Sequence, residues 1–342
     1  MMHARNHACD APPRGRTRGR ASVRPARRAR YGAAVFAAVA FAAGAFATGA
    51  GALSNETAEE IPWESGARRG IAPTQADIAE FTAATSVWYR VRTSQFTVLT
   101  HNRALSARVL EAAEAALTNT QRSLGISAAT KGPVELLVFR DLAESAPRQR
   151  GFRTTFPLPR WHDARLVGTH QLDETGMFRT AVLLDDIPSQ VAHVVLDAYF
   201  GGTDAPFALR EGLARTFEAS LASNLAGFAA AGAAGESWVA GARLFALGDD
   251  AIEDDALYHD VWNTGAAWGM FLREKLPPAR MGALLARLRN GDPIAQVLAD
   301  AFDHPPEDVL ARMDEELRDW VLMTFKPPEQ KPVVDLKKQG IT

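Results

Sequence analysis

Three side chains with metal-binding chemistry lie near one another in the sequence, on two segments that are expected to be helical. His193 and Asp197 are four residues apart, which places them on one face of a helix, one turn from each other. Glu211 follows 14 residues later, early in the next predicted helix. An imidazole and two carboxylates are ligands that Zn²⁺ accepts, so the three residues are a candidate metal site.

The same residues also have an ordinary structural interpretation. His193 is consistent with a histidine that is hydrogen-bonded within the core, and Asp197 with a residue that faces solvent. Glu211 has Arg210 and Arg215 as near neighbours with which it can form an ion pair. The spacing alone leaves the metal site and the structural interpretation open.

The segment Glu211-Gly212-Leu213-Ala214, downstream of a helix with a central histidine, gives the chain a family resemblance. Together with the order strand, long helix, strand and motif helix, it resembles the peptidase-MA-like, gluzincin-type zinc metallopeptidases of bacterial envelopes. In that family one helix carries H-E-x-x-H, with two zinc ligands and a general base, and a second helix supplies a glutamate ligand. The resemblance extends from Trp88 to about Phe325, and it implies an α+β, zincin-like fold with Zn²⁺ as the cofactor.

The match departs from the family at two positions on which catalysis depends. By the resemblance His193 takes the first ligand position and Glu211 the third, but Asp197 stands where the family has its second histidine. Val194 stands where the family has its catalytic glutamate, and valine cannot accept a proton. A general base contributes about 10²–10⁴-fold to such reactions. The sequence therefore predicts a metallopeptidase-like protein without catalytic activity, which acts by binding a peptide or an envelope protein.

Two other functions remain open. A hydrolase with a His/Asp/Glu metal site requires a different base, and Tyr258, His259 and Glu218 are the side chains expected to surround such a site. A purely structural envelope module requires no ligand. His162 and His170 lie in the middle of the chain, where the resemblance implies an edge strand that lines a substrate cleft, but both are expected to be loop residues.

The elements that position these residues fall into two lobes. Residues 87–187 are predicted to be β-rich with one long helix at 104–124, and residues 188–325 to be all-helical. The predicted strands of the first lobe are Trp88–Arg92, Gln95–Thr100, Pro133–Phe139 and Phe178–Leu184. The predicted helices of the second lobe are 189–200, 207–224, 236–247, 256–276, 279–290, 293–302 and 306–324.

The first 52 residues differ from the rest of the chain in charge. Residues 1–30 hold nine Arg and one acidic residue, and residues 31–52 hold no charged residue, eleven Ala and four Gly. A basic segment before an apolar run of about 20 residues is typical of an exported protein. Residues 31–52 are predicted to be either a cleaved signal peptide or a transmembrane anchor, and both place the rest of the chain outside the cytoplasm.

The rest of the chain, residues 53–342, is acidic, with 29 basic and 39 acidic residues. Nucleic-acid binding is not expected, because phosphate contacts need a basic face. The single cysteine, Cys9, excludes a disulfide within the chain. Residues 53–86 are predicted to be a linker and residues 326–342 an exposed tail.

Overall fold

A computed structural model describes most of the chain beyond the apolar N-terminal run. The described residues are 58–62, 72–130, 132–149, 160–163, 165–203, 205–232, 238–248 and 255–325. All of them belong to one compact unit, Ala50–Thr342. The predicted basic head (1–30), the apolar segment (31–52) and the tail (326–342) lie outside the described residues. Within the described ranges, no helix is both long and apolar enough to cross a membrane.

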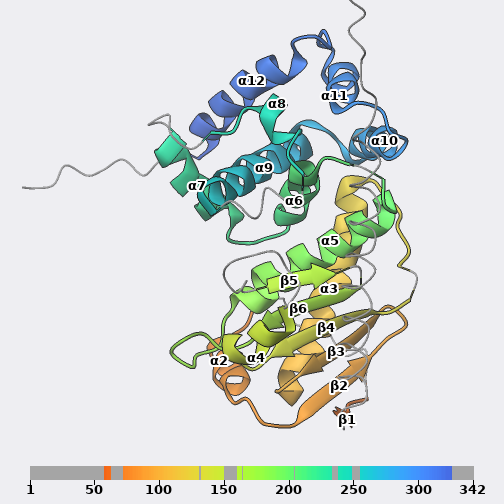
Figure 1. Cartoon of the computed structure of the whole chain (residues 1–342). Helices are drawn as coiled ribbons and strands as arrows, with labels where there is room; N and C mark the ends of the chain where they lie inside the picture. The colour runs from red at the N-terminus through yellow and green to blue at the C-terminus, as the bar shows by residue number, and fades with distance from the viewer. Residues whose placement is uncertain are drawn as a thin grey trace, which may run out of the picture. The chain divides into compact units, whose positions relative to one another are not determined.

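The first half of the described chain forms a mixed sheet of six strands (Figure 1). These are β1 (Ala58–Glu60), β2 (Trp88–Arg92), β3 (Phe96–Thr100), β4 (Val134–Phe139), β5 (Arg160–Asp163) and β6 (Leu166–His170). Their order across the sheet is β1-β2-β3-β4-β6-β5. The pairs β1–β2, β3–β4 and β4–β6 are parallel, whereas β2–β3 and β5–β6 are antiparallel. The antiparallel strand β5 is therefore an edge strand of the described sheet.

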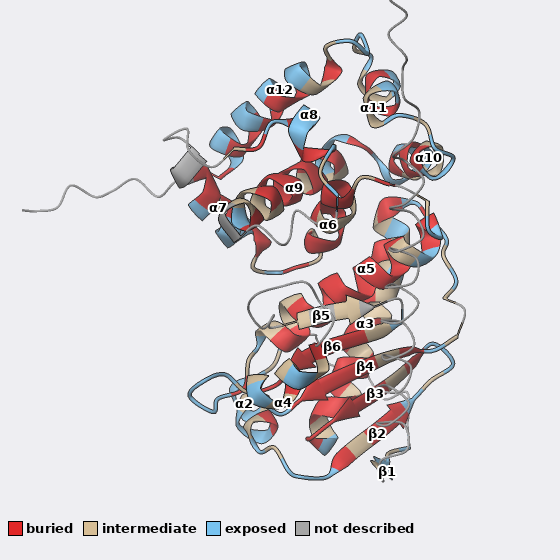
Figure 2. Cartoon of the chain, in the orientation of Figure 1, coloured by how far each residue is buried: buried red, intermediate tan, exposed pale blue. Residues whose placement is uncertain are grey.

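Two helices cover one face of this sheet. They are α3 (Arg103–Leu124), which contacts β2 and β3, and α5 (Ile187–Phe200), which contacts β5, β6 and α3. Alternate strand residues such as Val98, Leu136 and Val167 face these helices in the main core. A smaller cluster on the opposite face contains Trp88, Leu99, Leu137 and Phe139. Figure 2 shows that α5 is buried along most of its length, so this helix lies at the centre of the molecule's core.

The second half is helical, as predicted. Its elements are α6 (Phe207–Arg215), α7 (Leu221–Gly232), α8 (Gly241–Leu244), α9 (Asp255–Lys275), α10 (Pro278–Arg289), α11 (Ile294–Phe302) and α12 (Val309–Thr324). The single helix predicted at 207–224 is two helices, α6 and α7, separated by a turn at 216–220. Of the helix predicted at 236–247, the described residues contain the short α8. The predicted α+β class is confirmed by the mixed sheet and these helices.

One predicted strand is wrong. Phe178–Leu184 does not pair with any strand of the sheet, and Phe178 forms an isolated bridge with Leu172, which lies outside the sheet. Instead, Val182–Asp186 forms a π-helical turn that leads directly into α5. Val182 and Leu183 are fully buried, and a short buried apolar run has the same pattern in a strand and in a helix.

Two further elements lie within the segment predicted as a linker. The strand β1 pairs with β2, and α2 (Gln75–Thr82) contacts α3. The helix α2 begins with a capping box, in which the Thr74 side chain accepts from the Asp77 backbone and the Asp77 side chain accepts from the Thr74 backbone. After β4, the one-turn helix α4 (Leu142–Ser145) continues into a 3₁₀ turn at Ala146–Gln149.

Candidate functional site

The helix α5 places His193 and Asp197 on one side of its axis. Pro188 lies in its first turn, where a proline is tolerated, and Gly201 ends it in the left-handed conformation, with φ 61°. His193 is 4% exposed, whereas the side chain of Asp197, one turn later, is 28% exposed. The pair therefore runs from the core toward the surface.

The helix α6 brings Glu211 against α5 because it packs tightly on α9. A Cβ atom added at Gly212 would lie 1.9 Å from the carbonyl oxygen of Gly265. One added at Gly269 would lie 2.4 Å from the carbonyl oxygen of Gly212. Only residues without a side chain allow the two backbones to approach this closely. Gly212 is thus required by the packing of α6 on α9, beside the carboxylate that α6 presents to α5.

Side chains from three elements meet at this place. His193 Nδ1 lies 3.4 Å from Glu211 Oε1, which joins α5 to α6. Arg210 Nη1, also on α6, donates to Asp197 Oδ1 at 3.0 Å. The other carboxylate oxygen of Asp197, Oδ2, is 3.4 Å from His162 Nε2 on β5. Glu211 thus contacts His193 directly, whereas Asp197 is joined to them through Arg210, the neighbour of Glu211, and through His162, so that the five side chains form one cluster.

His162 is the member of this cluster that the sequence analysis missed. The expectation of a loop is wrong, because His162 lies on the edge strand β5. Its ring stacks on His193, with centroids 4.4 Å apart and an interplanar angle of 9°. Its Nδ1 is 3.0 Å from Gln190 Oε1 on α5. The antiparallel pairing of β5 with β6 determines this position, and no short-range pattern around His162 indicates that pairing. His170 is likewise in a strand, at the end of β6.

The environment divides the cluster into a charged part and a largely neutral part. Burial alone would lower the pKa of His162, but the hydrogen bond and charge of Asp197 outweigh it and raise the pKa. Burial alone would raise the pKa of Asp197, but His162 and Arg210 hold it below its usual value. Burial lowers the pKa of His193 well below its ordinary value. Burial also raises the pKa of Glu211 to about 7, so this carboxyl is largely protonated below neutral pH.

This arrangement does not fit a zinc ion. Among the described residues, no group of three or more His, Cys, Asp or Glu side chains is placed to hold a metal. A zinc ligand donates its lone pair in the plane of the imidazole ring, and the planes of His162 and His193 are parallel, so their lone pairs do not converge on one point. Both carboxylate oxygens of Asp197 already contact other side chains.

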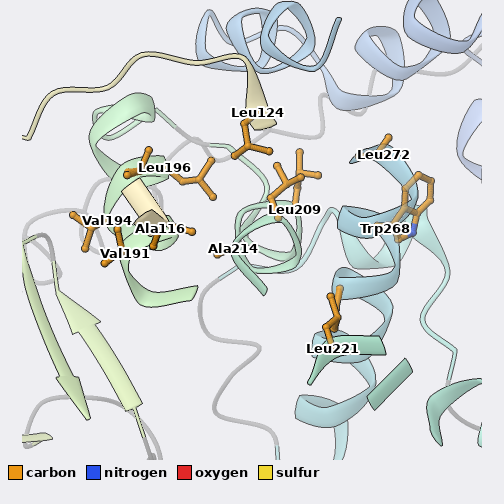
Figure 3. Packing of buried hydrophobic residues seen from close by; sticks show 14 of the residues in the cluster. Ala116, Leu124, Val191, Val194, Leu196, Leu209, Ala214, Leu221, Trp268 and Leu272 are labelled. Carbon is orange, nitrogen blue, oxygen red and sulfur yellow. The ribbon is translucent and has the colours of Figure 1, made fainter. Parts of the chain in front are cut away.

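Val194 faces away from the cluster. It is 1% exposed and lies, with Val191, on the side of α5 that packs toward Ala116 of α3 (Figure 3). Val194 also lines a cavity of about 390 Å³. The other lining residues are Ser94, Gln95, Phe96, Leu117, Gln121, Ser127, Ala128, Ala129, Thr130, Gly132, Val134, Val191 and Val195. The side chain at the position of the family's catalytic base therefore belongs to the core.

Glu218 takes part in a second, buried ion-pair network beside the cluster. Its carboxylate contacts the guanidinium groups of Arg160 on β5 and Arg215 on α6. Arg160 also reaches Asp186, which in turn pairs with Arg179. Both carboxylates are almost completely buried, so each needs the positive charges around it. The network ties β5 to the helices on either side of the candidate site, and it occupies Glu218 with two arginines.

The remaining predicted surroundings of the site, Tyr258 and His259, lie at the beginning of α9. Tyr258 is buried and its ring contacts those of His259 and Trp262. His259 is exposed. Arg215 lies over the ring of Trp262, 5.3 Å from its centroid, so Tyr258 is linked to the Glu218 network through aromatic packing.

A larger cavity, of about 780 Å³, lies elsewhere, at the ends of β4 and β6. It is lined by Asp141, Leu142, Ala143, His170, Leu172, Asp173, Glu174, Thr175, Gly176 and Arg179. His193, Asp197 and Glu211 line neither this cavity nor the one beside Val194.

Comparison with known proteins yields no assignment. No protein-family model matches the chain, and no curated protein is significantly similar to it in sequence.

Proposed function

We propose that this protein is an exported, zincin-like relative of the peptidase-MA-like metallopeptidases that has no catalytic activity and binds an extended peptide or an envelope protein. The observation that carries the proposal is the burial of Val194, which is 1% exposed and lies on the side of α5 that packs toward Ala116 of α3. A valine in this place supplies no base to a metal-bound water.

The order of elements supports the zincin-like part of the proposal. The strand β3, the long helix α3, the strand β4 and, after β5 and β6, the motif helix α5 come in the order that the resemblance implies. The edge strand β5 contacts α5, as expected of a strand that lines a substrate cleft. The Glu211-Gly212 pair lies on the next helix, beside His193.

The position of β5 supports the binding part of the proposal. It is the terminal strand of the described sheet, and an extended peptide binds to such an edge by adding a strand through main-chain hydrogen bonds. Export is supported by the nine arginines that precede the apolar segment 31–52, which places the peptide or envelope protein on the outer side of a membrane.

A peptidase assay tests the absence of catalysis. The full-length protein is incubated with denatured casein, with and without added Zn²⁺, beside the matched variant His193→Ala. We expect the same background rate for both proteins under both conditions, because neither has an activated water. Zinc-dependent cleavage by the wild type that His193→Ala abolishes would contradict the proposal.

Hydrogen exchange tests the binding site. We expect added denatured casein to slow exchange of the amides of β5, because strand addition gives them new hydrogen-bond partners. The amides of α12, on the far side of the fold from β5, serve as the internal control and should not change. Protection that appears elsewhere and spares β5 would exclude this edge as the binding site.

A further inference from the structure

The cavity of about 390 Å³ beside α5 lies at the amino ends of two neighbouring parallel strands. Phe96 begins β3 and Val134 begins β4, and these two residues are partners in the sheet. Both line the cavity, together with residues of α3 and α5, the two helices that cover this face of the sheet. The sheet and both helices therefore border the cavity, which lies at the opposite end of β4 from the larger cavity beside His170.

The lining of this cavity changes from buried and apolar to exposed and polar. Val191, Val194 and Val195 share one face of α5, and each is at most 2% exposed. Ser94, which precedes β3, and Ser127, which follows α3, also line the cavity, and both are exposed. The cavity thus has an apolar inner part and a mouth with polar groups.

The size and charge of the cavity restrict what it can bind. Its volume lies within the range of about 300–1,000 Å³ that is typical of small-molecule sites, which are mostly apolar with a few polar groups. None of the described residues that line it is charged. A charged ligand would lose its hydration there without gaining a countercharge, whereas an aliphatic group gains by leaving water.

We propose that this cavity binds an uncharged molecule that has an aliphatic body and one hydrogen-bonding end, as a medium-chain alcohol has. The body lies against the valines of α5, and the polar end faces the hydroxyl and amide groups nearer the mouth. Gln121 of α3 supports this arrangement, because its Nε2 donates to the carbonyl oxygen of Ala128 at 2.8 Å and holds the segment after α3 beside the cavity. No described residue of β5 lines the cavity, so this ligand site is separate from the proposed peptide-binding edge.

Titration of the full-length protein with three probes tests the class of ligand. The probes are 1-octanol, octanoate and octylammonium, which share one aliphatic chain and differ in the charge of its end. In isothermal titration calorimetry at neutral pH, we expect 1-octanol to bind at least tenfold more tightly than either ion. Binding of octanoate or octylammonium that equals or exceeds that of 1-octanol would overturn the inference.

A variant that fills the cavity tests the location of the site. Leu117→Trp introduces a larger side chain at a half-buried lining position of α3, and we expect it to weaken 1-octanol binding at least tenfold. The matched control is Leu310→Trp, at a half-buried position of α12 that does not line the cavity, and it should bind like the wild type. All three proteins contain the apolar segment 31–52, so any alcohol that binds there contributes equally. Equal affinity of Leu117→Trp and the wild type would exclude this cavity as the site.

A measurement on the wild type keeps the test independent of whether a variant folds. In methyl NMR spectra we expect nuclear Overhauser effects between the chain of 1-octanol and the methyl groups of Val191 and Val194, and none to those of Leu310. If Leu117→Trp is unfolded, these contacts decide the question. Their presence supports the inference, and their absence overturns it.

Discussion

Replacing Val194 by glutamate introduces the general base of the peptidases that the sequence resembles, and the structure predicts that this change destabilises the fold without giving catalytic activity. Val194 is 1% exposed and borders a cavity whose lining side chains carry no charge. The new carboxyl would enter this cavity, where the side chains of Gln95 and Gln121 and nearby hydroxyl groups are the polar neighbours. It would lie on the side of α5 that packs on α3, away from the cluster around His193.

The expected decrease in the free energy of unfolding of Val194→Glu has two parts. Burying a protonated carboxyl with imperfect hydrogen bonding costs about 2 kcal/mol at acidic pH. Ionisation lowers the free energy of unfolding further. If burial raises the pKa of the glutamate by about 3 units, the folded variant loses roughly 4 kcal/mol of stability once the carboxyl is charged. A raised pKa in the folded state makes the penalty grow as pH rises above about 4.3, the value in the unfolded chain. The total at pH 8, about 6 kcal/mol, equals the whole free energy of unfolding of a domain at the lower end of the usual range of about 5–15 kcal/mol.

Urea unfolding, followed by circular dichroism at pH 5 and pH 8, measures this cost. The matched control is Val194→Gln, which has the same shape but no ionisable group, so its loss of stability should be nearly independent of pH. We expect Val194→Glu to be close to the control at pH 5 and several kcal/mol less stable at pH 8. Equal pH dependence in the two variants, or zinc-dependent cleavage of casein by Val194→Glu, would show that residue 194 reaches water or the cluster and would refute the reasoning.

Two further predictions follow from the packing and the charge of α6. Gly212→Ala should destabilise the protein by at least about 2 kcal/mol in urea unfolding, because its Cβ would lie 1.9 Å from the Gly265 carbonyl oxygen. Gly227→Ala, where a Cβ meets nothing within 4 Å in the helix α7, should instead leave stability unchanged or raise it by up to about 1 kcal/mol. Glu211→Gln should gain stability relative to the wild type as pH rises from 4.5 to 8, by roughly 3 kcal/mol, because the pKa of Glu211 is raised to about 7 and the folded wild type resists its ionisation. A wild type and variant with parallel pH profiles would show that Glu211 is not buried as the structure has it.

The helical half was predictable because its signals are local. The helices predicted at 279–290 and 293–302 agree within one residue with α10 and α11, where Pro278 and Pro293 mark the beginnings and apolar residues recur at helical spacing. The strand predicted at Phe178–Leu184 failed because local signals are ambiguous there. Its apolar residues are buried, but in a turn that enters α5.

The candidate site was predictable only in part, for the same reason. The spacing of His193 and Asp197 on a helix placed them on one face, and the structure brings Glu211 beside His193. The role of His162 depends on the pairing of β5 with β6 and on the packing of β5 against α5, which are long-range contacts. From the sequence, Arg210 was a candidate ion-pair partner of its neighbour Glu211. In the structure it forms an ion pair with Asp197.

The departures from the family pattern are connected through the structure. Val194 contributes to the core on one side of α5, while Asp197 on the other side is held by Arg210 and His162 from two further elements. A single substitution toward the family motif therefore disturbs either the core or the charge balance without completing a catalytic site. A glutamate at position 194 would still face α3. Because the side chains that hold positions 194 and 197 lie on β5, α3, α5 and α6, both departures from the motif are fixed by the packing of neighbouring elements.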